Sequence, residues 1–326
     1  MATTAIQALE YRTKAVSKQR DALRCSLLML GFLAAAVITV EGGARLLVEH
    51  ISRVESRISS EYAAALLPPS GSRPLVLFVG NSLLLQGVRF DRLRDASAAQ
   101  FEARRFVVES ADYRDWQYGL RRLHAAGVRP SVLVLMLDAK QLVSDGSRGE
   151  YTAFRLTRHR DILALSSDLG LNPTATSSMV FANFSMFYGL RSEIRKAVLG
   201  RLMPDLPRLT HRFALSPAPE IPGEVLRTKV RARMRGLRDE SAAHNVRLVF
   251  AVHPSAQSYD TVLRLRSAVT EAGVPAMLPF GAGEYGAGDF TDGLHLTGDA
   301  ADRYTGELIA TTRQAAASWF RDGGRE

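Results

Sequence analysis

A carboxylate and an imidazole stand three residues apart near the end of the chain, where Asp292 and His295 lie in the segment DGLHLTGDAADRYT. On one tight turn this spacing lets the carboxylate accept the proton of ring nitrogen Nδ1. That contact fixes the tautomer of the imidazole and leaves Nε2 free to face a hydroxyl. A histidine oriented in this way is a general base, so the pair predicts one half of a nucleophilic catalytic site.

The candidate hydroxyl belongs to Ser82, which follows Gly80 and Asn81 at the end of a predicted strand over 75–79. Ligands bind at the carboxyl ends of the strands of a parallel sheet, so a serine there is either a turn former or a nucleophile. The presence of an acid-oriented histidine favours the nucleophile. An acyl-enzyme would then divide a difficult transfer into two easier steps, and neither step needs a metal or a cofactor.

A second histidine also follows a predicted strand. His253 stands in the segment FAVHPS, but no carboxylate follows it at a useful spacing. A His-Pro step at the end of a strand is common in turns. We therefore regard His253 as a rival base to His295 and as the less favoured of the two.

Alternating elements must position these side chains. Strands are predicted at 75–79, 104–110, 131–137, 246–252 and 274–278, and helices near 90–102, at 114–125, at 258–272 and from about 299. Such alternation is typical of an α/β fold in which helices cover both faces of a parallel sheet. Residues 145–222 interrupt the alternation, and we expect them to form a helical insertion over one edge of the sheet.

An uncharged apolar stretch over 25–40 follows a basic segment. It is shorter than the roughly 20 residues that a bilayer core needs, but continuing through EGGARLLV completes the span if Glu41 and Arg45 lie near the far interface. Lys and Arg are more frequent before the span than after it, which favours a cytoplasmic amino terminus. A buried core helix and a cleaved signal peptide are the alternatives. The predicted organisation is a cytoplasmic tail at 1–24, a membrane anchor at 25–49, a stalk and linker at 50–73, and an extracytoplasmic domain at 74–326.

Composition narrows the possible partners. The 326 residues carry a formal net charge of +9, yet no zinc-ligand set, recognition helix or aromatic-interleaved basic stretch accompanies that charge. Anionic membrane lipid or an acidic glycan therefore fits at least as well as nucleic acid, and we expect no nucleic-acid partner. The segment EVLRTKVRARMRGLRDE carries a row of arginines, which is either a solvated helix face or a docking surface. A single cysteine, Cys25, excludes an intramolecular disulfide.

The sequence resembles the SGNH (GDSL-type) hydrolases, in particular membrane-anchored members found with polysaccharide O-acylation systems. The resemblance covers 74–143 and 246–315, with VGNSLLLQGV similar to the first family block and DGLHLTGDAADRYT similar to the last. It implies a flavodoxin-like parallel sheet, with Ser82 as the nucleophile completed by Asp292 and His295. The G-x-S-x-G pattern of α/β-hydrolases fails here because Leu84 occupies the last glycine position.

Two family blocks depart from the pattern of the resemblance. The second block has Ser110 or Ala111 where a glycine with an oxyanion-binding N–H is expected, and the third has Asp138 in place of an asparagine. A carboxylate cannot donate a hydrogen bond unless it is protonated. Loss of one oxyanion donor costs about 2.7–4 kcal/mol of barrier. The candidate oxyanion-hole residues are therefore Ser82, Asn81, Ala111 and Asp138.

These observations favour an extracytoplasmic serine acyltransferase that acts on a cell-envelope or exported polysaccharide. The resemblance implies a multi-pass membrane-bound O-acyltransferase as its partner. An esterase with the same three residues is the first alternative. A non-catalytic glycan-binding or scaffold subunit is the second, and the two altered blocks favour it.

Overall fold

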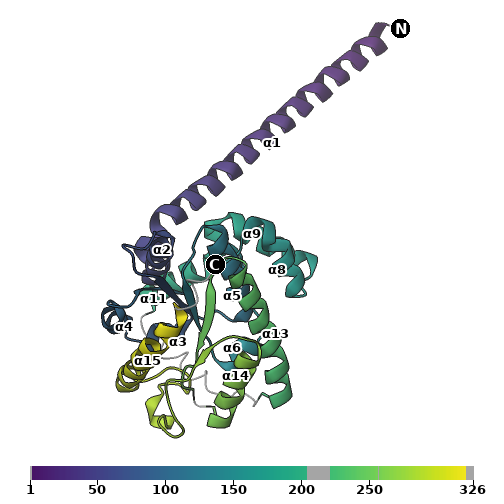
Figure 1. The fold of residues 1–326 in the computed structure, drawn as a ribbon. Helices are drawn as coiled ribbons and strands as arrows, with labels where there is room; N and C mark the ends of the chain where they lie inside the picture. Colours follow the sequence, from purple (N-terminus) through teal and green to yellow (C-terminus); the bar gives the residue numbers. More distant parts are fainter. Residues whose placement is uncertain (1, 204–220, 256, 321–326) are drawn as a thin grey trace.

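The computed structural model describes residues 2–203, 221–255 and 257–320, and a five-stranded sheet lies at its centre (Figure 1). All its strand pairs are parallel, and the strand order is β2-β1-β3-β4-β5. Flavodoxin-like sheets have this order. The strands are β1 (Leu75–Gly80), β2 (Glu102–Val107), β3 (Val132–Met136), β4 (Arg247–Ala251) and β5 (Ala276–Met277).

Helices cover both faces of the sheet, as the alternation of elements predicts. They are α4 (Phe90–Ser97), α5 (Tyr113–Ala125), α13 (Gly223–Ala242), α14 (Tyr259–Glu271) and α15 (Gly298–Trp319). Helix α15 packs beside α4, whereas α13 packs against α5 and α14. The predicted α/β class is thus confirmed.

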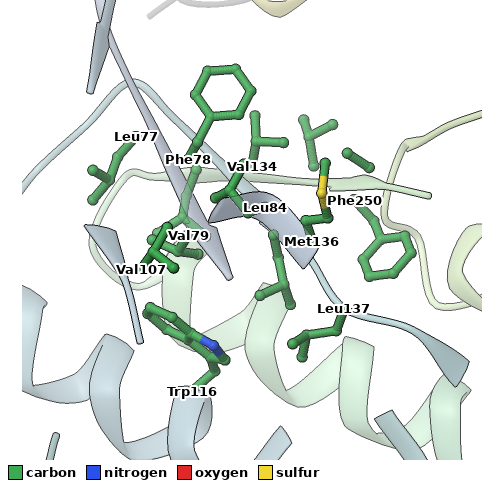
Figure 2. Packing of buried hydrophobic residues seen from close by; sticks show 14 of the residues in the cluster. Leu77, Phe78, Val79, Leu84, Val107, Trp116, Val134, Met136, Leu137 and Phe250 are labelled. Carbon is green, nitrogen blue, oxygen red and sulfur yellow. The ribbon is translucent and has the colours of Figure 1, made fainter. Parts of the chain in front are cut away.

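Strand β1 is buried along its whole length. Its side chains Leu77, Phe78 and Val79 pack among residues of the neighbouring strands and with Trp116 of α5 (Figure 2). The sequence of a strand in the interior of a parallel sheet is a continuous run of apolar residues, because helices cover the strand on both sides. The residues that follow β1 therefore start from a rigid position in the core.

The region between β3 and β4 is helical where the structure describes it. It contains α6 (Ala139–Val143), α7 (Glu150–Arg155), α8 (Ile162–Asp168), α9 (Pro173–Phe184), α10 (Met186–Gly189) and α11 (Arg191–Leu202). A second, smaller core lies beneath α7, α8 and α9, with Tyr118 of α5 contributing to it. The part of the predicted insertion at 204–220 lies outside the described residues.

The predicted stalk is wrong for residues 53–66, because α2 (Arg53–Leu66) packs on the domain. Glu55 is fully buried and accepts hydrogen bonds from Tyr151 Oη at 2.8 Å and Arg155 Nη2 at 2.6 Å. Glu61 accepts the N–H of Val107 in β2 at 2.9 Å. These long-range bonds join α2 to both the sheet and the insertion.

A single helix, α1 (Ala2–Ile51), precedes α2. Its part from Arg20 to His50 is long and apolar enough to cross a membrane, and an 18-residue stretch within it has a mean hydropathy of 2.1. Length and composition of this kind fit an anchor or a signal sequence. The predicted boundaries of tail and anchor, 1–24 and 25–49, fall inside this one helix.

The basic face of α13 is a solvated one. Arg227 pairs with Glu271 of α14 at 2.9 Å, and Arg231 lies 3.8 Å from the same carboxylate. The opposite face of α13 is buried in the core, through Leu226, Val230, Met234 and Leu237. Intramolecular pairing accounts for part of the arginine row, which weakens the interpretation of this face as a docking surface.

Candidate active site

Ser82 is held at the carboxyl end of β1 by the two residues before it. A Cβ on Gly80 would lie 2.6 Å from the carbonyl oxygen of Met136 in β3, so only glycine permits this close approach of the two strands. Asn81 is the N-cap of α3 (Ser82–Gly87): its Oδ1 accepts the N–H of Leu83 at 3.1 Å. Ser82 is consequently the first residue of a capped helix.

Asp292 and His295 lie on a tight turn before α15. Gly293 has a φ of 77°, which lets the chain reverse, and Asp292 Oδ1 accepts the N–H groups of Leu294 at 3.0 Å and His295 at 2.8 Å. A bridge between Phe290 and Leu296 closes the turn. The spacing of the two residues thus produces the geometry expected from the sequence.

The three predicted catalytic residues meet. His295 Nε2 lies 2.8 Å from Ser82 Oγ, and His295 Nδ1 lies 2.7 Å from Asp292 Oδ2. The side chains of His295 and Asp292 keep 18% and 25% of their exposure. This arrangement is a hydrogen-bonded serine, histidine and aspartate relay that remains accessible to a ligand.

The carboxyl of Asp292 favours its ionised form. Partial burial acts to raise its pKa, but hydrogen bonds from the backbone and ring of His295 and from the N–H of Leu294 outweigh burial, so the pKa lies below its ordinary value. An ionised Asp292 accepts a hydrogen bond from the Nδ1–H group of His295. The proton-free Nε2 is then the atom that faces the serine.

Two backbone N–H groups are candidates for the oxyanion hole. The N–H of Ser82 stands in the first turn of α3, where a helix offers no intrahelical acceptor. The N–H of Ala111 points to Val108 O at 3.3 Å, a long hydrogen bond. Ser110, which directly precedes Ala111, has a φ of 56°, a conformation that glycine adopts more easily.

The other two oxyanion candidates are occupied by structural bonds. Asn81 Nδ2 donates to Ala111 O at 2.9 Å, so this amide joins the end of β1 to the loop after β2. Asp138 is the N-cap of α6: its Oδ1 accepts the N–H of Gln141 at 2.7 Å. Burial raises the pKa of Asp138 to about 6, so at neutral pH its carboxyl is largely ionised and is no donor.

His253 lies under the site and outside the relay. It is 3% exposed, its ring packs edge-on against Tyr304 with centroids 5.2 Å apart, and burial lowers its pKa to about 3. A Cβ on Gly87 at the end of α3 would lie 2.2 Å from His253 Nε2. His253 therefore supports the helix that carries Ser82, a contact that nothing in the spacing of the sequence could reveal.

Besides the relay, the described residues form two cavities and include possible metal ligands. Cavities of about 780 Å³ and 750 Å³ lie elsewhere, the first beside β5 and α15 and the second between α2, α4 and β2, and neither is lined by a residue of the relay. Among residues 2–203, 221–255 and 257–320, no cluster of three or more His, Cys, Asp or Glu side chains is placed to hold a metal ion.

Comparison with known proteins adds little to this geometry. No family model and no curated protein matches the chain. Among solved structures, LAE5, an alpha/beta hydrolase enzyme from the metagenome of Lake Arreo, Spain, is similar over 76% of this chain and 97% of its own, with 10% identity and a TM-score of 0.39. A similarity this distant carries no argument about fold or function.

Proposed function

We propose that the protein is a serine acyl-transfer enzyme of the SGNH hydrolase type. The observation that carries this proposal is the continuous relay from Ser82 Oγ through His295 to Asp292, with distances of 2.8 Å and 2.7 Å. Positions 213 residues apart in sequence meet in the order that the resemblance to SGNH hydrolases implies. A turn-forming serine would need neither an oriented imidazole nor a buried strand behind it.

In the first step, His295 Nε2 takes the proton of Ser82 while Oγ attacks the carbonyl carbon of an acyl donor. The tetrahedral intermediate collapses to an ester on Ser82, and the proton on Nε2 passes to the leaving alcohol. In the second step His295 takes a proton from an incoming hydroxyl, whose oxygen attacks the ester. The bond to Ser82 Oγ breaks, and the proton on Nε2 passes to Oγ and regenerates Ser82. Asp292 stabilises the imidazolium in both steps, and the N–H groups of Ser82 and Ala111 are the candidate donors to the oxyanion.

The proposed acyl acceptor is a hydroxyl of a cell-envelope or exported polysaccharide. Partial exposure of His295 and Asp292 leaves the relay open to a polymer that approaches from solvent. The apolar part of α1 supports attachment to the membrane, with the catalytic domain outside the cytoplasm. A multi-pass acyltransferase that supplies the acyl group is the partner that we propose.

An esterase is the second candidate, because water can replace the sugar hydroxyl without any change in the relay. The intact relay disfavours a non-catalytic scaffold. Because Asp138 caps α6 and donates no hydrogen bond when ionised, the oxyanion hole is left with backbone donors alone. The turnover of a simple ester would then be low, since the loss of one oxyanion donor lowers kcat by about a hundredfold to a thousandfold.

The test is acylation of Ser82 in the purified protein. An activated acyl ester should add the mass of one acyl group to the peptide that contains Ser82, and Ser82→Ala should abolish that adduct. Ser177→Ala, which removes an exposed hydroxyl from α9, is the matched control and should leave the adduct in place. Release of free acid on dilution indicates the esterase, whereas transfer to an added glycan indicates the acyltransferase. An unmodified Ser82 peptide, combined with normal glycan acylation in cells that carry only Ser82→Ala, would refute catalysis and favour the scaffold.

A further inference from the structure

The predicted anchor is bonded to the helical insertion at one residue, Glu41. Its carboxylate accepts the hydroxyl of Ser185 at 2.8 Å, the N–H of Met186 at 2.9 Å and the N–H of Phe187 at 3.2 Å. The first turn of α10 is thereby fixed to the side of α1. Since Arg45 also donates to Glu41 at 2.9 Å, the carboxylate is held from both directions.

This contact lies at the outer end of the apolar stretch. Glu41 directly follows the uncharged residues 25–40, which at 1.5 Å per residue form about 24 Å of helix. Farther along α1, Ala44 and Val48 are buried against the domain. Figure 1 shows α8 and α9 on the side of the domain from which α1 leaves. If residues 25–40 lie in the bilayer, the end of α9 and the start of α10 lie at the level of the lipid headgroups.

The insertion exposes aromatic rings at this level. Phe181 and Phe184 lie three residues apart on one face of α9 and keep 66% and 61% of their exposure, and Phe187 of α10 keeps 42%. The rings are held in place rather than loose. Phe184 stacks on His159 with centroids 4.7 Å apart, and the second core lies beneath the helix.

Basic side chains accompany the apolar ones on α11, which packs beside α1 and α10. Arg195, Lys196 and Arg201 are exposed, and Val198 and Leu202, four residues apart on the same helix, keep 46% and 73% of their exposure. These residues offer both apolar area and positive charge to a membrane interface, although Lys196 also pairs with Glu193 at 3.0 Å. The positive charge complements an anionic lipid surface.

We propose that α9, α10 and α11 form a second membrane contact, in which Phe181, Phe184 and Phe187 enter the headgroup region of a bilayer rich in anionic lipid. The domain is then held at two places, by the spanning part of α1 and by this interfacial surface, and Glu41 joins them. The second contact fixes the orientation of the domain relative to the membrane. This inference is independent of the chemistry at Ser82.

The test measures the depth of a spin label on the full-length protein in vesicles of phosphatidylglycerol and phosphatidylcholine. Cys25→Ser removes the native thiol, and Phe181→Cys and Phe184→Cys each provide one labelling site. Leu263→Cys on α14 is the matched control, since this residue is a similarly exposed apolar side chain (42%) on a helix far from α1 in Figure 1. Thermal unfolding of each variant verifies the fold.

Labels at 181 and 184 should collide more often with oxygen, which concentrates in lipid, than with an aqueous nickel chelate, and the label at 263 should show the reverse. Arg195→Gln combined with Lys196→Gln should shift the first two labels toward the aqueous pattern. Labels at 181 and 184 that are as aqueous as the one at 263 would overturn the proposal. Shielding that appears in native membranes and is absent from pure lipid vesicles would also overturn it, because a protein partner would then cover this surface.

Discussion

Asp292 supports His295 in two ways, because one oxygen accepts the ring N–H and the other accepts two backbone N–H groups. Asp292→Asn keeps an oxygen for the backbone bonds but no longer favours the tautomer with a proton on Nδ1. We expect an intact fold and a turnover lower by about ten-thousandfold, the size of the effect in serine proteases. Ester hydrolysis by the purified variant, compared at equal folded concentration, measures this loss.

Asp289→Asn is the control for that change. Asp289 lies in the same loop, where it pairs with Arg303 at 2.6 Å, and it has no contact with the relay. Its replacement should leave turnover nearly unchanged. A comparable loss in both variants would mean that loop geometry, and not the tautomer of His295, explains the effect. If folded His253→Ala and His295→Ala lost turnover equally, our assignment of His295 as the base would be wrong.

Asp138 predicts a pH dependence of stability. Burial raises its pKa from 3.8 to about 6, with the nearby carboxyl of Asp112 acting in the same direction, so the folded protein binds this proton more tightly than the unfolded chain. The stabilisation is complete below pH 3.8 and is lost as pH rises to about 6. Asp138→Asn keeps the helix cap and removes the buried charge. The variant should gain up to ~3 kcal/mol over the native protein at pH 7.5, and much less at pH 4.

Denaturant unfolding at several pH values tests this sign. Asp145→Asn serves as the contrast, because hydrogen bonds and charge from Lys229 and Arg233 hold the pKa of Asp145 below its ordinary value. That variant should lose stability at neutral pH and approach the native protein in acid. A larger gain for Asp138→Asn at pH 4 than at pH 7.5 would contradict our assignment of the buried charge.

The same replacement tests the oxyanion hole. Gly80 is in register with Met136, so Ser82 and Asp138 each lie two residues beyond paired positions on neighbouring strands. An amide at 138 can donate a hydrogen bond where an ionised carboxylate cannot. We expect kcat/KM on a simple ester to rise at pH 7.5, by up to the hundredfold to thousandfold that one donor contributes in other enzymes. An unchanged rate would show that backbone donors alone form the hole.

At the level of elements, α3 and His253 form a packed unit that positions Ser82. Gly87→Ala would place a methyl group 2.2 Å from Nε2 of the buried His253 ring, so the ring or α3 would have to shift. Overpacking of this kind costs about 1–3 kcal/mol and would displace α3 together with its serine. We expect lower stability and a lower turnover number. Combining Gly87→Ala with His253→Ala should restore part of both.

Gly236→Ala is the matched control for the glycine, since nothing lies within 4 Å of a Cβ at this position of α13. It should be neutral or stabilise the helix by up to about 1 kcal/mol. If Gly87→Ala were equally harmless in unfolding and activity measurements, the packing of α3 on His253 would have no part in positioning Ser82.

The elements differ in how well the sequence predicts them. The pattern of apolar residues located all five strands and the flanking helices. Strands that are buried on both sides appear in the sequence as short apolar runs, and helices that cover them have apolar residues on one face. The same pattern did not predict that α2 packs on the domain, because the sequence of this helix looks polar. Glu55 and Glu61 are buried there through partners 96 and 46 residues away, and no local pattern carries that information.

The site shows the same division. The turn from Asp292 to His295 is local, and its spacing predicts its geometry. The role of Asp138 as a helix cap follows in the same way from its spacing to Gln141, whereas the role of Asn81 depends on Ala111 in another loop. The sequence therefore predicts which residues meet at the site and which local caps they form, whereas contacts between distant segments become visible only in three dimensions.

At the scale of the whole molecule, our proposal has α1 link the domain to the membrane. The contacts of α1 with the domain then define which residues an exchange of the span can include. Residues from Glu41 onward bond to or pack on the domain, so we would exchange only 25–40 for an unrelated apolar helix of equal length. If a multi-pass acyltransferase recognises the native span, the exchanged protein should no longer co-purify with it in mild detergent. Glycan acylation in cells should fall, because a tethered domain loses its high effective concentration beside the donor.

The activity of the purified exchanged protein on a model ester separates coupling from chemistry. It should equal that of the native protein, because the relay and the contact between Glu41 and Ser185 are both retained. A control exchange that keeps residues 25–40 and replaces only the tail at 2–19 should preserve glycan acylation. Full acylation with the exchanged span would argue against recognition through the membrane. If, in addition, no acyltransferase co-purified with the native protein, an esterase would be the better proposal. Hydrolysis uses water as the acyl acceptor and needs no protein partner.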